Sequence, residues 1–274
     1  MPYLDGTVIE LLRPNAPRGR LRSALFDFDG TLSLVREGWQ GVMIPMMVEI
    51  LAQTPQHEGE NELRAIVTEF VERLTGEQTI YQMIQLTEEV ARRGGRPEAP
   101  MAYKRRYHDR LWERIQGRVA ALKEGRVAPD EMLVPGARAF LEALGARGIV
   151  CYLASGTDEP YVRDEATALG IAGFFAGIYG ARDDYLRATK KAVIEHILRA
   201  HDLRGDEMAA FGDGYVEIDN VKSVGGLAIG VASNEAERRG VNAWKRERLI
   251  RAGADVIVPD FREHEELVSY LLDG

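Results

Sequence analysis

An apolar run that ends in two acidic residues lies near the start of the chain: Leu25-Phe26-Asp27-Phe28-Asp29-Gly30-Thr31-Leu32. Its first residues are apolar on consecutive positions, which is typical of a strand buried on both faces of a parallel sheet. Asp27 and Asp29 flank one aromatic residue, so both carboxylates can point away from the core just past this strand. A turn is the simpler interpretation, because Asp-Gly is a common turn pair. The spacing does not fit a calcium-binding loop, since Thr31 stands where that loop requires Asp or Asn.

Further apolar runs of strand length follow along the chain and are bounded by Gly or Asp. They are Ile149–Ala154, Phe174–Tyr179, Met208–Phe211, Leu227–Val231 and Asp255–Val258, with a weaker edge strand at Thr7–Leu11. Helix patterns with one apolar stripe lie between them, as at residues 193–198. This alternation predicts an α/β fold built on an open, doubly wound parallel sheet.

A long helix-like region interrupts the alternation between the first and second strands. It runs over residues 34–133, and turn signals such as Thr75-Gly76 and Ala99-Pro100 divide it. About a hundred helical residues are too many for one crossover connection. We therefore expect an all-helical domain, residues 34–133, inserted into an α/β core formed by residues 1–33 and 134–274.

Composition limits the classes of function. The chain has 274 residues and is 45% hydrophobic, so it can bury a large core. Its net charge of −8 argues against nucleic acid or an anionic membrane as the main partner. The single cysteine, Cys151, excludes an internal disulfide framework. With no apolar stretch of about 20 residues and no apparent signal peptide, we expect a cytoplasmic protein; its oligomeric state stays open.

Polar residues gather where the predicted strands end, and open α/β sheets bind their ligands at that edge. Ser155-Gly156 offers a hydroxyl and a backbone N–H to one anion, although a helix cap would also use such a serine. Lys190-Lys191 begins a predicted helix, where cations are slightly unfavourable, which points to an anion as the partner of one of them, although solvated lysines are the simpler interpretation of this feature alone. Asp213 and Glu217 are four residues apart and can converge on a hard cation, although a glycine-rich turn followed by a helix-stabilising glutamate also fits.

The order and placement of these residues resemble the four motifs of the haloacid dehalogenase superfamily of phosphohydrolases. In chain order the motifs are Asp27–Thr31, Ser155-Gly156, Lys190, and Gly212-Asp213 with Glu217. Lys190 fits the family spacing better than Lys191. The helical insertion stands where that superfamily carries its first type of cap. Glu217 departs from the aspartate that the family often has, which leaves direct or water-mediated metal contact open and Asp219 as a competitor.

The resemblance implies a Mg²⁺-dependent phosphomonoester hydrolase. Asp27 would be the nucleophile that forms an aspartyl-phosphate, and Asp29 would protonate the leaving oxygen and later deprotonate water. Mg²⁺ would be held by oxygens of Asp27, the Asp29 carbonyl, Asp213 and Glu217. Because an alkoxide leaving group needs an acid whereas a halide does not, Asp29 favours a phosphate ester over a haloacid.

The phosphate group would be bound by a second set of residues that the resemblance supplies. They are the Ser155 hydroxyl, Lys190, and backbone N–H groups near Gly156 and Gly30. The substrate is expected to be a small phosphorylated metabolite such as a sugar or polyol phosphate, chosen by the cap. Candidate substrate contacts in the cap are Trp39, Gln40, Gln78 and Thr79.

Other functions stay open within this resemblance. A sugar phosphomutase uses the same core residues, but the comparable cap turn, residues 74–79, has no cation to grip a second phosphate. A phosphonatase would need a desolvated cap lysine, and nothing in the sequence marks Lys104 or Lys123 as one. A catalytically silent, phosphate-binding regulatory module is the non-enzymatic alternative. Against it, every catalytic carboxylate, lysine and hydroxyl position is present.

Overall fold

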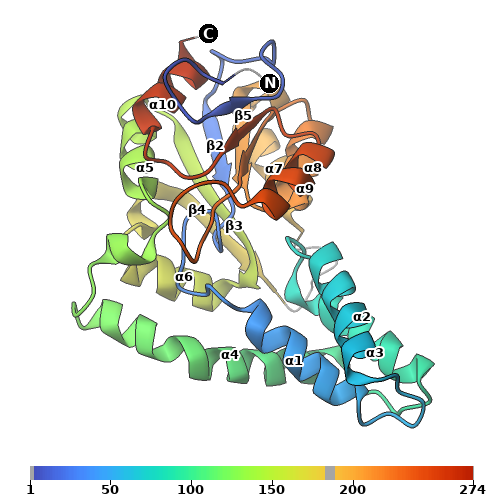
Figure 1. Ribbon diagram of the computed structural model, residues 1–274. Coiled ribbons are helices and arrows are strands. Elements are labelled where there is room, and N and C mark those ends of the chain that lie inside the picture. The colour runs from blue at the N-terminus through green and yellow to red at the C-terminus, as the bar shows by residue number, and fades with distance from the viewer. Residues whose placement is uncertain (1–2, 183–188, 274) are drawn as a thin grey trace. The chain divides into compact units, whose positions relative to one another are not determined.

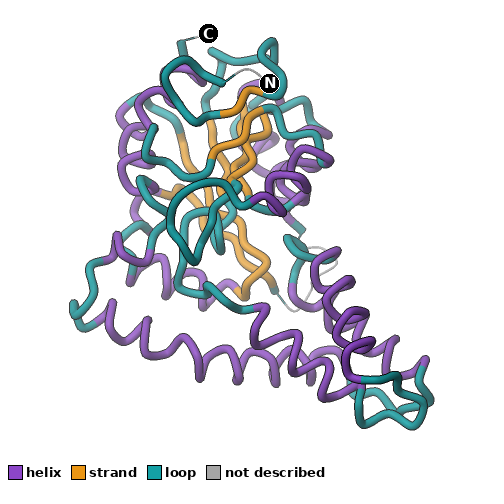
Figure 2. The backbone as a smooth tube through the Cα atoms, in the orientation of Figure 1, coloured by secondary structure: helices purple, strands orange, loops and turns teal. Residues whose placement is uncertain are grey.

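The computed structural model describes residues 3–182 and 189–273 of the chain, which divides into two compact units (Figures 1 and 2). The core unit is Met1–Glu37 with Ala121–Gly274, and the helical unit is Gly38–Ala120. The sequence prediction set these boundaries at residues 34 and 133. Residues just before 134 belong to the core unit because Leu133 bridges to Ser33 and Leu32 accepts the next backbone N–H.

A seven-stranded sheet with strand order β1-β7-β6-β5-β2-β3-β4 forms the centre of the core unit. The strands are β1 Glu10–Leu11, β2 Ser23–Phe26, β3 Val150–Asp158, β4 Phe175–Ala181, β5 Met208–Gly212, β6 Leu227–Val231 and β7 Val256–Val258. Neighbouring strands are parallel except for β1, which pairs antiparallel with β7. The doubly wound α/β fold is confirmed, although only the last two residues of the predicted edge strand form one.

Helices cover both faces of this sheet (Figure 1). The helices α7, α8 and α9 lie on one face, and α5 and α10 lie on the other. The core-unit helices are α5 Ala137–Ala146, α6 Glu159–Ala168, α7 Lys190–Ala200, α8 Tyr215–Ser223, α9 Ala243–Arg251 and α10 His264–Leu272. Short 3₁₀ turns η1 Pro129–Met132, η2 Ala172–Phe174 and η3 Gly205–Glu207 complete the connections.

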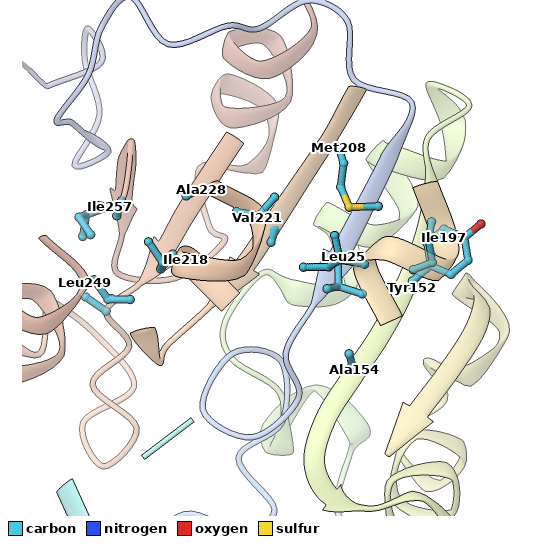
Figure 3. Close-up of a cluster of buried hydrophobic side chains, with 14 residues drawn as sticks. Leu25, Tyr152, Ala154, Ile197, Met208, Ile218, Val221, Ala228, Leu249 and Ile257 are labelled. Atoms are coloured by element: carbon cyan, nitrogen blue, oxygen red, sulfur yellow. The ribbon is translucent and has the colours of Figure 1, made fainter. Parts of the chain in front are cut away.

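Strand β2 is held from both sides by apolar packing. Leu25 lies in a buried cluster with Tyr152, Met208 and residues of α7 and α8 (Figure 3). Phe26 points to the opposite face, since side chains alternate along a strand, and it stacks on Phe211 with ring centroids 4.6 Å apart. Burying each such side chain contributes about 1.5–3 kcal/mol. The residues that follow Phe26 therefore start from a rigid base.

The helical unit contains four helices and has its own apolar core. They are α1 Gln40–Leu51, α2 Glu60–Arg73, α3 Thr79–Arg92 and α4 Pro100–Lys123, the last of which ends in the core unit. Met47, Leu63, Val67 and Leu86 are fully buried, as the apolar spacing of helices packed on one side requires. The insertion between the first two parallel strands is thus all-helical, as expected.

No helix within residues 3–182 or 189–273 has both the length and the hydropathy that crossing a bilayer requires.

Candidate active site

Asp27 and Asp29 lie directly after the central strand β2. The Asp27 N–H donates to the Phe211 carbonyl at 2.9 Å, which extends the pairing of β2 with β5 by one residue. Phe28 is fully buried, and its carbonyl accepts the N–H groups of Leu32 and Ser33. This tight loop follows from the anchored aromatic residue between the two acids, and it places both carboxylates at the carboxyl edge of the sheet.

Lys190 joins the carboxylates of two sequence-distant motifs. Its Nζ lies 2.6 Å from Asp27 Oδ1 and also donates to Glu217 Oε1. All three side chains are buried, whereas Lys191 is exposed. Lys190 is the first residue of α7, whose cap is the Thr189 side chain. The structure thus brings Asp27, Lys190 and Glu217 into one ion-paired group.

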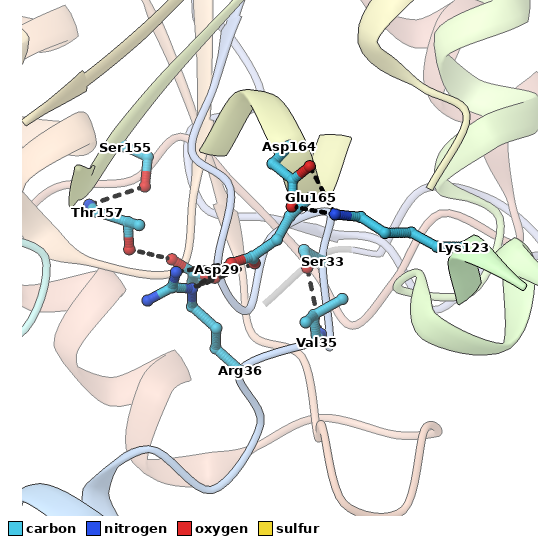
Figure 4. Close-up of polar contacts among 9 residues, drawn as sticks. All are labelled: Asp29, Ser33, Val35, Arg36, Lys123, Ser155, Thr157, Asp164 and Glu165. Atoms are coloured by element: carbon cyan, nitrogen blue, oxygen red, sulfur yellow. Dashed lines mark hydrogen bonds and ion pairs between the residues drawn. The ribbon is translucent and has the colours of Figure 1, made fainter. Parts of the chain in front are cut away.

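Asp29 is held by a residue that the sequence analysis did not select. Thr157 Oγ1 donates to Asp29 Oδ2 at 2.9 Å, and the Thr157 N–H donates to Ser155 Oγ at 3.1 Å (Figure 4). Asp158, not Ser155, occupies the cap position of α6. Residues 155–157 are therefore directed to the site by β3, next to β2. A hydroxyl two residues after Ser155 was the only signal in the sequence.

Arg36 provides positive charge on the other side of Asp29. Its Nε lies 3.8 Å from Asp29 Oδ1, and its guanidinium forms a bidentate pair with Glu165 of α6, at distances down to 2.6 Å (Figure 4). Arg36 and Glu165 are both buried. Bidentate arginine–carboxylate pairs are geometrically specific, so this pair fixes the segment that follows the motif-one loop.

Burial raises the pKa of several site carboxyls. The pKa of Asp27 is raised to about 6 by burial, an effect that Lys190 opposes and Asp213 reinforces. The pKa of Asp29 is also raised to about 6, by burial and against the pull of Arg36. Burial raises the pKa of Glu217 to about 8 in spite of Lys190. Clustered carboxyls of this kind are typical of functional sites, and they favour a cation.

The site offers oxygen ligands of the kind that a hard divalent cation binds. Within the described residues no three acidic, histidine or cysteine side chains form a ready-made metal cluster. The negative charge of Asp213 raises the pKa of Asp27. Both side chains supply carboxylate oxygens, which Mg²⁺ prefers as ligands. Glu217 Oε2 is buried without a hydrogen-bond partner in the described part of the chain. The residues fit Mg²⁺, because this ion is usually bound through one or two carboxylates and keeps several waters.

The structure also places the remaining core residues that the sequence suggested for the site. Gly30 has a φ of +75°, and a Cβ there would lie 2.4 Å from Asp213 Oδ2, so the close approach of two loops requires glycine. Its N–H donates to the Ser33 carbonyl, and the expected phosphate contact near Gly30 stays a prediction. Gly156 lies in β3 beside Ser155. Asp219 is exposed and does not compete with the buried Glu217.

The four cap candidates all lie at helix starts of the helical unit. Trp39 immediately precedes α1 and Gln40 begins it. Gln78 is buried just before α3, and Thr79 is the first residue of that helix. Their contact with substrate stays a prediction.

A doubly wound sheet with acidic side chains and a lysine at its carboxyl edge defines a class of ligand-binding α/β proteins. Comparison with known families narrows this class. The model of the haloacid dehalogenase-like hydrolases matches residues 21–225, and the chain belongs to that family. The expected superfamily and the expected hydrolase class are confirmed.

Individual relatives are distant. A 5'-nucleotidase of Pseudomonas aeruginosa is 29% identical over 127 residues, which are 44% of this chain. The match spans about half of that relative's length, 55%.

Solved structures with a similar fold cover nearly the whole chain. One is a Haemophilus somnus protein described as a predicted phosphoglycolate phosphatase, 18% identical, with a TM-score of 0.59 and coverage of 91% of this chain and 98% of that one. Another is the β-phosphoglucomutase of Clostridium difficile, 14% identical, with a TM-score of 0.62 and coverage of 92% and 98%. A third is CbbY of Rhodobacter sphaeroides in complex with xylulose 1,5-bisphosphate, 19% identical, with a TM-score of 0.56 and coverage of 89% and 96%.

Proposed function

We propose that this chain is a Mg²⁺-dependent phosphomonoester hydrolase that acts through an aspartyl-phosphate on Asp27. The observation that carries the proposal is the pairing of Asp27 with Lys190 beside an Asp29 held by Thr157. One carboxylate is thereby fixed next to a cation. The other is fixed two residues away, next to a hydroxyl. A nucleophile and an acid–base group need this separation of roles.

The first half-reaction transfers the phosphoryl group to the enzyme. An Asp27 carboxylate oxygen attacks phosphorus and forms an acyl phosphate, while the bond from phosphorus to the ester oxygen breaks. Asp29, which the raised pKa of about 6 keeps partly protonated near neutral pH, gives its proton to that leaving oxygen. The step releases the alcohol and leaves Asp29 as a carboxylate.

The second half-reaction returns the enzyme to its starting state. Asp29 is now a carboxylate and takes a proton from water, whose oxygen attacks the phosphorus of the acyl phosphate. The bond from phosphorus to the Asp27 oxygen breaks, inorganic phosphate leaves, Asp27 is again a carboxylate and Asp29 again carries its proton. Thr157 keeps Asp29 oriented in both steps, since its hydroxyl donates to one oxygen of Asp29 and leaves the other for the proton.

Lys190 and Ser155 provide the contacts to the phosphoryl oxygens. Lys190 remains an ammonium because Asp27 and Glu217 raise its pKa against the effect of burial. A buried cation next to the nucleophile compensates negative charge on the phosphoryl oxygens during transfer. Glu217 holds this lysine through Oε1. We therefore assign Glu217 an indirect role, through Lys190.

Mg²⁺ would be held by Asp27, Asp213 and the Asp29 carbonyl. When bound there, it offsets the repulsion between an anionic nucleophile and an anionic substrate.

The substrate is proposed to be a small phosphorylated metabolite in the cytoplasm, and the helical unit is proposed to act as the substrate-selecting cap. Its insertion directly after motif one supports this role, because a domain that closes over a site sequesters the reaction from water and commits the substrate. The names of the similar proteins support small phosphorylated substrates in general: a nucleotidase, a phosphoglycolate phosphatase and a protein bound to a sugar bisphosphate. Lys123 pairs with Asp164, which disfavours it as a phosphonatase lysine. Lys104 is buried, although nothing in the sequence marked it as desolvated.

Product analysis tests the proposal. The purified protein is incubated with phosphorylated sugars, polyols, glycolate and nucleotides, with Mg²⁺ or with EDTA, and inorganic phosphate and isomeric sugar phosphates are quantified. We expect phosphate release that requires Mg²⁺ and is lost in Asp213→Asn. Conversion of a sugar phosphate to its isomer without phosphate release would make the chain a phosphomutase. No product with any substrate would favour the regulatory module.

A further inference from the structure

A buried lysine outside the four motifs lies beside the proposed cation site. Lys245 is in the first turn of α9, and its Nζ contacts three acceptors. These are Asp213 Oδ2 at 2.7 Å, Glu235 Oε1 at 2.6 Å and Ser233 Oγ at 3.0 Å. An ammonium has three N–H donors, so the three acceptors match its full capacity.

Ser233 extends this group to the motif-one loop. Its hydroxyl donates to the Gly30 carbonyl at 2.5 Å. A hydroxyl has one hydrogen to donate, and therefore Ser233 accepts from Lys245. The chain of hydrogen bonds runs from Lys245 through Ser233 to Gly30. It connects the loop after β6 with the loop after β2, while Lys245 also binds the loop after β5.

The residues around Lys245 fix its position and its charge. Asn242 caps α9 and accepts the Lys245 N–H at 3.1 Å, which fixes the turn that carries the lysine. A cation in the first turn of a helix is unfavourable in itself. Burial opposes the charge too, yet Asp213 and Glu235 raise the pKa of Lys245. The two carboxylates are therefore the reason for a charged lysine at this place.

Gly30 shows how tightly the loops meet. A Cβ on Gly30 would lie 2.4 Å from Asp213 Oδ2 and 2.9 Å from Lys245 Nζ. The motif-one loop, the motif-four carboxylate and the lysine thus share one contact point, and a shift of any one of them displaces the others.

We propose that Lys245, with Ser233, is a positioning residue for the divalent-cation site. It holds Asp213 by one carboxylate oxygen and the motif-one loop by the Gly30 carbonyl, so that the cation ligands are arranged before the cation binds. Hydrogen bonds to metal-binding carboxylates typically account for about 10–100-fold in metal affinity. The inference rests on the proposed function, because it takes Asp213 as a cation ligand.

Calorimetric titration of Mg²⁺ into the substrate-free protein tests this role without measuring turnover. The main variant is Lys245→Met with Glu235→Gln, because losing one positive and one negative charge together leaves the local net charge unchanged. We expect its dissociation constant for Mg²⁺ to rise about tenfold. Lys222→Met is the matched control. It removes another ion-paired lysine of the core unit, the partner of Asp255, and should keep the parent's affinity.

Ser233→Ala keeps the test decisive if the double variant does not fold, as judged by its thermal unfolding. It removes one small buried hydroxyl and should weaken Mg²⁺ binding several-fold. Unchanged or tighter Mg²⁺ binding in the variants that fold would overturn the positioning role of Lys245 and Ser233 but not the proposed function. A parent protein that binds no Mg²⁺ would overturn both this inference and the proposed cofactor. Mg²⁺ binding that depends on Lys245 in a protein without phosphatase activity would contradict only the proposed function.

Discussion

At the scale of single residues, the two aspartates of motif one have different surroundings. Asp27 is paired with a lysine, whereas Asp29 accepts a hydrogen bond from Thr157 and lies 3.8 Å from Arg36. Burial raises the pKa of both to about 6, so the two roles follow from their neighbours. Asp27 contacts the lysine proposed to bind the phosphoryl group, whereas Asp29 keeps one carboxylate oxygen free of hydrogen bonds within the described residues. The separation of nucleophile from acid is therefore built into the neighbours of the two residues.

Asp29→Ala tests the acid role. An alkyl phosphate needs a proton on its leaving oxygen, whereas a nitrophenolate leaves without one. We expect kcat on alkyl phosphates to fall about 10²–10⁴-fold and kcat on nitrophenyl phosphate to fall far less. Steady-state rates on the two substrates give the ratio. Equal losses on both would show that Asp29 only positions other groups.

Lys190→Met tests how the buried carboxylates are compensated. Without the lysine, Asp27 and Glu217 are buried without a counter-ion, and removing one partner of a buried pair costs about 3–5 kcal/mol. In the parent, burial raises the pKa of Asp27 to about 6 and that of Glu217 to about 8, although Lys190 lowers both. Without Lys190 both pKa values rise further. As the pH falls through this range, the buried carboxylates of the folded variant take up protons and lose their charge. The stability that Lys190→Met loses relative to the parent should therefore be smaller at low pH.

Urea unfolding in EDTA, at pH 8 and at pH 5, measures this difference. The free energy of unfolding of Lys190→Met should be much lower than the parent's at pH 8 and closer to it at pH 5. The exposed neighbour Lys191 provides the control, and Lys191→Met should match the parent at both values. A loss for Lys190→Met that is the same at both pH values would argue against charge as its cause.

At the scale of elements, the site is made by loops that extend well-packed strands. The sequence was sufficient to predict β2, β5 and β6, because their consecutive apolar residues have few other stable arrangements. It was also sufficient for the motif residues, whose order follows the strands. Thr157 and Lys245 were missed because their roles depend on contacts across 128 and 32 residues, to Asp29 and Asp213 respectively. Such contacts leave no local periodicity.

Alanine substitutions at two glycines with positive φ should affect activity and stability differently. An alanine Cβ at Gly30 meets the ends of side chains, Asp213 and Lys245, whereas one at Gly136 lies 2.2 Å from the Phe261 backbone carbonyl oxygen. We expect Gly30→Ala to lower kcat at least tenfold while costing about 1–3 kcal/mol of stability. Gly136→Ala should unfold at a clearly lower temperature yet keep the parent's kcat while folded. Parental kcat in Gly30→Ala would refute the close approach of the two loops.

At the scale of the whole molecule, an α/β core carries an all-helical unit of its own. The helix-like pattern and the turn signals predicted the insertion, but its limits differ because the chain before Pro135 returns to the core through Ser33 and Leu133. Such long-range pairing cannot be deduced from a helical pattern. The contribution of the helical unit to specificity is therefore a question for substrate ranking.

Thr79→Ala addresses this contribution. Thr79 is half-buried at the start of α3, and its hydroxyl is a candidate contact for a substrate hydroxyl. We expect the order of kcat/KM among phosphorylated metabolites to change while nitrophenyl phosphate turnover stays largely intact. Thr87→Ala is the control on the same helix, because its hydroxyl donates to the Met83 carbonyl and should not affect the ranking. An unchanged order in Thr79→Ala would place specificity elsewhere.

The central claim is that Asp27 attacks phosphorus. The most direct test is the rate of phosphate release from nitrophenyl phosphate, with saturating Mg²⁺, for the parent and for Asp27→Asn. Asparagine has the same shape but is a far weaker nucleophile, so turnover should fall by about a thousandfold or more while circular dichroism shows the parent's fold. Turnover of Asp27→Asn within a few-fold of the parent would contradict the account.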